Sequence, residues 1–189
     1  TLDGCLVTHE HMDHAKSVKD LVKSAINVYA TNGTFKALNI DNHRAKIIKS
    51  NEYFKVNNLQ ILPYNTVHDA NEPVGYFIKD TNTNDSLMFV TDTAYLEYKV
   101  PDVEYLMIEC NYIKEKIDKN VENGTVNANL RNRIVRNHMS LETVLDVLNK
   151  MKKSNLKRVY ILHLSDSNSD EIEIKEEIQK ATGAEVVVA

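Results

Sequence analysis

The sequence predicts an α/β (α+β) fold with a large, partly antiparallel sheet. Short runs rich in β-branched and aromatic residues alternate with stretches whose apolar residues recur at helical spacing. The 189 residues are 42% hydrophobic and 26% charged, which is enough for a compact core. Neither an internal repeat nor a long linker divides the chain, so we expect one domain over residues 1–189.

Each expected element follows from its local pattern. Helices are expected where apolar residues recur every three to four positions, at residues 17–25, 140–153 and 170–182, and Ser140 is a plausible helix start. The polar segment 112–137 is expected to be irregular, and His43 is expected to lie at an exposed helix start. Strands are expected at residues 2–8, 26–31, 52–56, 59–67, 74–80, 86–92, 105–110, 158–164 and 184–189.

Composition excludes several classes of protein. The sequence has no apolar run of membrane-spanning length, and its first residues resemble a strand instead of a signal peptide. Cys5 and Cys110 lie in separate apolar runs, so we expect reduced core thiols and a cytoplasmic protein without a membrane partner. The formal net charge of −4 excludes a globally basic nucleic-acid binder and leaves a local basic patch open. The oligomeric state is not predicted.

The segment THEHMDH, residues 8–14, places three histidines and two carboxylates within seven positions. In an extended segment His9 and His11 point the same way, so both can bind one ion. Asp13 and His14 follow where the chain turns into a helix, and their side chains can bind a second ion. Imidazole and carboxylate ligands without thiolates suit zinc, manganese or iron. The alternative is a solvated histidine cluster in which Asp13 caps the helix.

Further ligands are expected where polar residues directly follow apolar strands. Carboxyl ends of strands gather at one sheet edge, and His68, Asp92 and His163 occupy such positions. Any one of them alone would more often be a turn or cap residue. Together with the first motif they complete a ligand set for two divalent metal ions, Zn or Mn, about 3.5–4 Å apart with a bridging hydroxide. We expect the whole set to converge on one rim of the fold.

The ordered pattern, HxHxDH followed by a strand-end His, a strand-end Asp and a late strand-end His, resembles the metallo-β-lactamase-fold superfamily of metal hydrolases. The segments HDANEPVGY, TDTAY, IECNY and LHLSDSNSD further resemble its WalJ (YycJ) branch of DNA exonucleases. The resemblance implies an αβ/βα sandwich. That family usually starts with several strands before the first motif, so the first strands of the sandwich are expected to be missing here.

The resemblance also implies roles for the ligands. One ion would be bound by His9, His11 and His68, and the other by Asp13, His14 and His163. Asp92 would bridge the two ions, and Asp13 is counted among the catalytic residues.

Two further residues resemble the Glu and His that tRNase Z-like enzymes pair near the scissile phosphate. They are Glu109 in IECN and His138 in NHMS. A carboxylate that holds an imidazole protonated would let His138 give a proton to the leaving oxygen. The alternatives are a solvated strand end for Glu109 and a surface residue at a helix start for His138.

Basic residues near His138 are candidates for phosphate contacts, because arginine forks match phosphate oxygens. The expected substrate-binding residues are Arg131, Arg133, Arg136 and Ser140. Lys114, Lys116 and Lys119 are weaker candidates because acidic residues interleave them. A terminal base could stack on an exposed tyrosine, for which the candidates are Tyr95, Tyr98 and Tyr112.

We therefore expect a metal-dependent phosphodiesterase or nuclease, a DNA exonuclease that uses a hydroxide bridging two metal ions, with nucleic acid as its partner. One alternative is a small-molecule metallo-hydrolase acting on a cyclic-nucleotide phosphodiester, an ester or a lactam. Another is a non-catalytic interaction module. Basic residues in the cleft favour the nuclease, and an enclosed apolar pocket favours the small-molecule enzyme.

Overall fold

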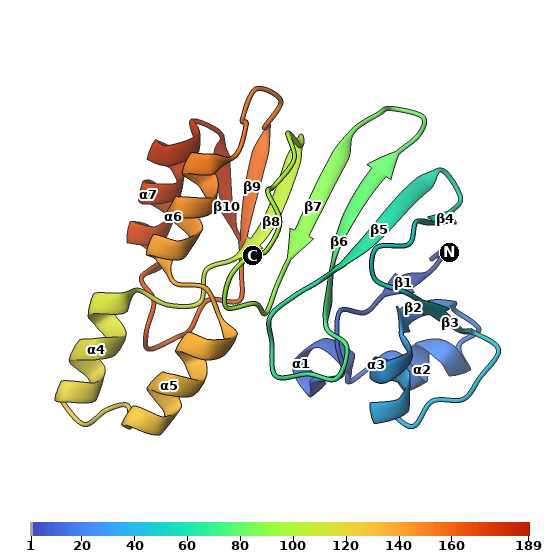
Figure 1. The fold of residues 1–189 in the computed structure, drawn as a ribbon, viewed down its shortest axis with the longest axis horizontal. Coiled ribbons are helices and arrows are strands. Elements are labelled where there is room, and N and C mark those ends of the chain that lie inside the picture. Colours follow the sequence, from blue (N-terminus) through green and yellow to red (C-terminus); the bar gives the residue numbers. More distant parts are fainter. Residues whose placement is uncertain (1) are drawn as a thin grey trace. The chain divides into compact units, whose positions relative to one another are not determined.

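The computed structural model describes residues 2–189, which form two compact units. The first unit holds residues 2–65 and 69–85, and the second holds residues 66–68 and 86–189. Figure 1 shows the elements of both. Between residues 2 and 189, none of the helices has the length and apolar character needed to cross a membrane. The expectation of one domain stays a prediction.

A small parallel sheet with the strand order β1-β2-β3 organises the first unit. Its strands are β1 (Cys5–Leu6), β2 (Val28–Thr31) and β3 (Ala45–Ile48). The helices between these strands are α1 (Met12–Ala15), α2 (Val18–Lys23) and α3 (Asn32–Ala37). The apolar stripe of α2 and the buried β2 residues form one core cluster of Val7, Ala15, Val18, Val22, Val28, Ala30 and Phe35.

The first unit also contains an antiparallel meander, built from β4 (Phe54–Val56), β5 (Leu59–Asn65) and β6 (Val74–Asp80). The rings of Tyr29 on β2 and Phe54 on β4 stack with centroids 5.3 Å apart. In the register of β5 and β6, Gly75 lies opposite Tyr64. Gly75 leaves room for the aromatic ring, since a Cβ there would lie 2.4 Å from Cζ of Tyr64.

Replacing Gly75 with alanine should therefore destabilise the protein. Tyr64 is buried, so its ring can move only by disturbing the packing around it. We expect a loss of about 1–3 kcal/mol in the free energy of unfolding, measured by urea denaturation. In a Tyr64→Leu background the same substitution should cost much less. Equal losses in both backgrounds would contradict the proposed clash.

The second unit is built on four parallel strands in the order β10-β9-β8-β7. They are β7 (Ser86–Val90), β8 (Tyr105–Glu109), β9 (Arg158–Leu162) and β10 (Glu185–Val188). The helices α6 (Leu141–Lys150) and α7 (Glu171–Thr182) pack side by side, and α7 contacts β10 (Figure 1). Parallel strands connected by helices in this unit and an antiparallel meander in the first confirm the mixed fold class.

Helix termini in the second unit follow the expected chemistry. The side chain of Ser140 caps α6 by accepting from the Thr143 N–H, and Asp170 does the same for α7 through Glu173. The helix α7 ends at Gly183, whose φ of 70° is a left-handed conformation that glycine adopts easily.

Two expectations about secondary structure were wrong. The polar segment 112–137 contains two helices, α4 (Lys114–Glu122) and α5 (Ala128–Asn137). Asn127 caps α5 by accepting from the Leu130 N–H at 2.8 Å, and Ile117 anchors α4 with a fully buried side chain. His43 precedes the strand β3 and does not begin a helix. A single buried residue per helix gives too weak an apolar periodicity to detect.

Candidate metal centre

The histidine motif of the first unit runs through the loop between β1 and α1. His11 occupies the N-cap position of α1 in an extended conformation, and His9 is almost fully buried. The ring centroid of His9 lies 4.7 Å from that of His11 and 4.4 Å from that of His14. His9 and His11 lie close together, as alternation predicted, and the ring of His14 lies beside that of His9.

Neighbouring oxygen atoms surround these imidazoles. The hydroxyl of Thr8 lies 3.0 Å from Nδ1 of His9, and Oδ2 of Asp13 lies 3.3 Å from Nε2 of His14. Asp13 lies inside α1, so the alternative in which it caps this helix is wrong. The carboxylate instead lies against an imidazole, as it would in a ligand set.

In the second unit, candidate residues follow three neighbouring parallel strands. Asp92 comes two residues after β7, Glu109 ends β8, and His163 directly follows β9. Val90 pairs with Ile108, and Glu109 pairs with Leu162, so the three strands end at the same level. The strand-end positions predicted for Asp92 and His163 are therefore found within this unit.

Asp92 lies between two histidines of the same unit. Its Oδ2 is 3.5 Å from Nε2 of His68, and its Oδ1 is 3.7 Å from Nε2 of His163. The side chains of Asp92 and His68 are each only 3% exposed. One carboxylate oxygen thus faces each imidazole, which is the arrangement expected of a bridging ligand.

The backbone of two of these residues is strained. Asp92 has a φ of 48° and His163 a φ of 57°, both in the left-handed region. Such conformations cost about 1–3 kcal/mol each unless the surrounding structure holds them, and they concentrate at functional sites. The amide nitrogen of Asn111 donates to the carbonyl of His163 at 2.9 Å and lies 3.0 Å from its Nδ1. Asn111 thereby helps to hold His163.

The chemistry of this donor set fits a divalent metal. Nδ1 of His68 lies 3.2 Å from the carbonyl oxygen of Asn137. Because a carbonyl only accepts, Nδ1 carries a proton, and Nε2 is the ring atom that faces the Asp92 carboxylate at 3.5 Å. A metal cation, or a proton on Nε2, would balance the negative charge of the carboxylate there. Histidine ligands of metals commonly donate their other N–H to a backbone carbonyl in this way.

Glu109 and His138 form a buried pair. Oε2 of Glu109 lies 3.0 Å from Nδ1 of His138, and its Oε1 accepts from the Thr93 N–H at 2.5 Å. Burial raises the pKa of the Glu109 carboxyl well above its usual range, whereas the Thr93 N–H lowers it. The pair can hold a proton between its two members. Glu109 is therefore buried and bonded, and the alternative of a solvated strand end is wrong.

His138 lies beside the other imidazoles of the second unit. Its ring stacks on that of His163 with centroids 5.0 Å apart, and its centroid is 5.4 Å from that of His68. Asp92, Glu109, His138 and His163 each offer a ligand-type atom, and these atoms lie within 4.8 Å of one another. His138 thus borders the ligand set and is only 16% exposed.

The expected substrate contacts have different surroundings. Arg131 pairs with Asp118 at 2.8 Å, whereas Arg133 and Arg136 are exposed on the last turns of α5. Ser140 is fully buried, and its hydroxyl caps α6, so it is not available to a substrate. Tyr112 is also buried, but Tyr95 and Tyr98 are 50% and 42% exposed. Of the candidates for substrate contact, Arg133, Arg136, Tyr95 and Tyr98 have exposed side chains.

Several supporting residues were not predicted. Asn111 and Thr93 hold site residues through a side-chain amide and a backbone N–H, and Asn137 does so through its carbonyl oxygen. Asn111 lies in the IECNY segment, so its position two residues after Glu109 was a usable signal. Backbone groups carry no residue-specific signal, because every amino acid except proline supplies both.

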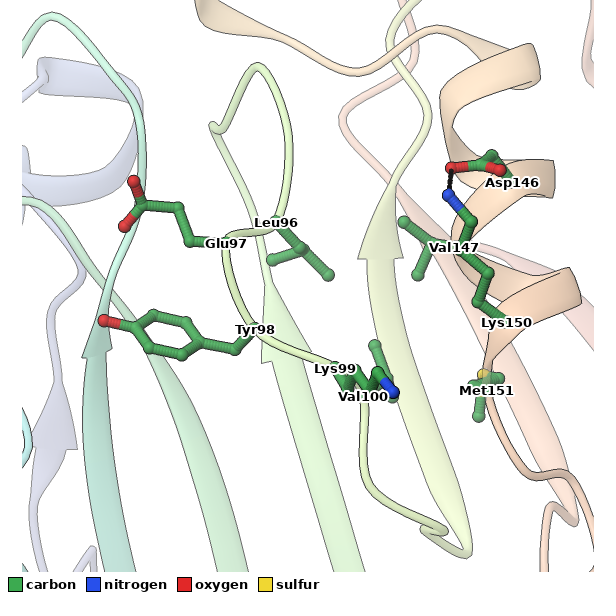
Figure 2. A pocket seen from close by; sticks show the side chains of 9 residues that line it. All are labelled: Leu96, Glu97, Tyr98, Lys99, Val100, Asp146, Val147, Lys150 and Met151. Carbon is green, nitrogen blue, oxygen red and sulfur yellow. Dashed lines mark hydrogen bonds and ion pairs between the residues drawn. The ribbon is translucent and has the colours of Figure 1, made fainter.

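A small cavity of about 170 Å³ lies elsewhere in the second unit, beside the loop that follows β7 (Figure 2). Leu96, Val100, Val147 and Met151 supply its apolar lining, and the Asp146–Lys150 ion pair lies at its edge. None of the candidate metal or catalytic residues lines it. This cavity therefore does not provide the pocket that a small-molecule hydrolase would need beside its metal ligands.

Comparison with known proteins identifies the family. Residues 1–164 match the model of the beta-lactamase superfamily domain. The chain belongs to the β-lactamase superfamily. It is 27% identical to exodeoxyribonuclease WalJ of Streptococcus pneumoniae (strain D39) over 183 residues, which cover 89% of this chain and 65% of that protein. It is also 27% identical to exodeoxyribonuclease YycJ of Bacillus anthracis over 184 residues, 90% of this chain and 67% of that one.

A solved structure confirms the superfamily fold. The metallo-β-lactamase-fold protein YhfI from Bacillus subtilis superimposes with a TM-score of 0.74 at 15% identity, covering 100% of this chain and 75% of that one. The predicted resemblance to this superfamily and to its WalJ (YycJ) members is thus confirmed. The chain spans 65% of the length of the Streptococcus WalJ relative. Membership and the exonuclease-named relatives support the expectation of a metal-dependent hydrolase.

Proposed function

We propose that this member of the superfamily is a metal-dependent phosphodiesterase that acts on nucleic acid, specifically a DNA exonuclease. The observation that carries the proposal is the Glu109–His138 pair beside Asp92 and His163. Hydrolysis of a phosphodiester requires a proton for the leaving oxygen, and this pair can supply one. The names of the WalJ and YycJ relatives favour DNA as the substrate.

The metal assignment remains that of the sequence analysis. We propose two divalent ions, Zn or Mn, with His9, His11 and His68 for one, Asp13, His14 and His163 for the other, and Asp92 shared. Its support is the donor chemistry found within each unit: clustered imidazoles in the first, and an Asp92 carboxylate facing two imidazoles in the second. Bound ions would supply an activated water and neutralise charge on the phosphate oxygens.

Other residues of the chain would donate the proton and bind the polymer. Glu109 fixes the ring of His138 through Nδ1, so Nε2 is the atom left to give a proton to the leaving oxygen. Thr93 keeps the Glu109 carboxylate oriented by donating its backbone N–H. Arg133 and Arg136 would bind the phosphates of the polymer without reading its sequence. Tyr95 and Tyr98 are exposed and would stack with a terminal base.

The direct test is digestion of end-labelled single- and double-stranded DNA and RNA by the protein with added Zn²⁺ or Mn²⁺. We expect stepwise shortening of DNA from an end, and loss of activity after chelation. Full activity in a chelator, or no cleavage of nucleic acid with either metal, would contradict the proposal. A cytoplasmic location and the absence of a membrane partner stay predictions.

Replacing Arg133 with alanine should weaken DNA binding and leave the chemistry intact. Removing one phosphate contact should lower the slope of log affinity against log salt by roughly 1. The rate on a small nitrophenyl phosphodiester should stay near that of the parent protein. Lys180→Ala is a matched control, because Lys180 pairs with Glu177 on the distant helix α7. An unchanged salt slope for Arg133→Ala would contradict this role.

A further inference from the structure

Glu10 lies between His9 and His11 and has no role in the ligand set. Its Oε1 accepts the backbone N–H of Asn71 at 2.9 Å and also accepts from the side-chain amide of Asn71. The two residues are 61 positions apart in the sequence, so this contact joins two distant segments of the first unit.

The segment around Asn71 is itself held firmly. Oε2 of Glu72 accepts from the Gly33 N–H at 2.6 Å, and the hydroxyl of Thr31 donates to the Glu72 carbonyl at 2.9 Å. A Cβ at Gly33 would lie 2.7 Å from Cγ of Glu72, so glycine permits this close approach. Asn71 is therefore attached through its neighbour to the start of α3, and it offers Glu10 a fixed partner.

The histidine motif needs such support. Residues 7–11 lie in neither strand nor helix, since β1 ends at Leu6 and α1 begins at Met12. The backbone N–H of Val74 donates to the carbonyl of Thr8 at 3.0 Å, just before the first histidine. Glu10 supplies the next attachment to the same segment, between the two imidazoles that must be spaced correctly.

We propose that Glu10 is a positioning residue, whose hydrogen bonds to Asn71 fix the backbone between His9 and His11 and so set the spacing of these imidazoles for a divalent ion. This inference rests on the metal dependence of the proposed function. Loss of a residue that orients metal ligands typically lowers metal affinity by about ten- to hundredfold. The contribution acts through geometry, because the Glu10 carboxylate bonds to Asn71 and is not among the proposed ligands.

The test measures the affinity of the metal-free protein for Mn²⁺ and Zn²⁺ by titration calorimetry. Glu10→Ala should weaken binding by about ten- to hundredfold. Glu10→Gln keeps an oxygen that accepts from Asn71, so it should restore affinity to within a few-fold of the parent. Asn71→Ala should weaken binding less than Glu10→Ala, because its backbone N–H remains. The double variant should bind no more weakly than Glu10→Ala alone, since both remove one interaction.

Asp80→Ala is the matched control. It removes the hydrogen bonds that Asp80 accepts from Asn82 and Thr83 in the turn after β6, so the protein should unfold at a lower temperature with metal affinity within about twofold of the parent. Equal weakening by Glu10→Gln and Glu10→Ala would overturn the inference, as would parent-like affinity in Glu10→Ala. Parent protein that binds neither metal would instead refute the proposed function, so the two failures are distinguishable.

Discussion

Asp92→Asn should abolish hydrolysis of DNA and lower the metal content of the protein. The substitution keeps the shape of the side chain and removes its negative charge. Asparagine adopts left-handed φ values readily, so the backbone at this position should be preserved. Each oxygen of Asp92 faces a different imidazole, at 3.5 and 3.7 Å. Without the charge, these atoms no longer form an anionic bridge that can hold two cations together.

The measurements are metal content by mass spectrometry after dialysis and digestion of end-labelled DNA. We expect at least one ion per chain to be lost and the cleavage rate to fall below detection. Asp102→Asn serves as the control, since Asp102 binds Ser154 and Asn155 at the surface, away from the ligands. A variant that retains two ions and full activity would show that Asp92 does not bridge them.

His138→Ala should retain the metal and lose most of its turnover on DNA. The substitution leaves every proposed metal ligand in place, and the loss of general-acid assistance should slow cleavage by roughly a hundred- to ten-thousandfold. The leaving group of a nitrophenyl phosphodiester is a stable nitrophenolate, which departs without being protonated. The variant should therefore keep most of its rate on that substrate. The comparison separates proton donation from binding.

Two further variants sharpen this test. Glu109→Gln keeps an acceptor for Nδ1 of His138 and removes the charge, so it should give a smaller loss confined to DNA cleavage. Arg133→Ala should instead affect binding to the polymer and its salt dependence. If His138→Ala lowers the rates on DNA and on the nitrophenyl ester equally, His138 is not the proton donor. It would then position the substrate or support the structure.

Much of the fold could be predicted because its signals are local. Two of the three expected helices begin directly after the residues that cap them, Ser140 and Asp170. The parallel strands β7, β8 and β9 carry nearly continuous apolar runs, and a candidate site residue lies at or just after the end of each run. Asp92 and His163 were predicted on this basis, whereas Glu109 was predicted from the resemblance to tRNase Z-like enzymes.

The features that were missed depend on long-range contacts or on weak local patterns. The helices α4 and α5 present mostly polar surfaces, so their sequence resembled an irregular segment. Ser140 was expected both to begin a helix and to contact substrate, and its fully buried hydroxyl caps α6. The contact between His68 and the carbonyl of Asn137 involves a backbone atom, which no sequence pattern identifies.

The bond between His68 and Asn137 also bears on the order of folding, because it spans 69 positions of the chain. Closing a loop of this length costs conformational entropy, and contacts of such range form late relative to helices and short turns. THEHMDH is local and can assemble early, whereas the approach of His68 to Asp92 must await the completed parallel sheet and α5. A nascent or partly folded chain would therefore carry only four of the seven proposed ligands, and the proposed two-metal centre would be complete only at the end of folding.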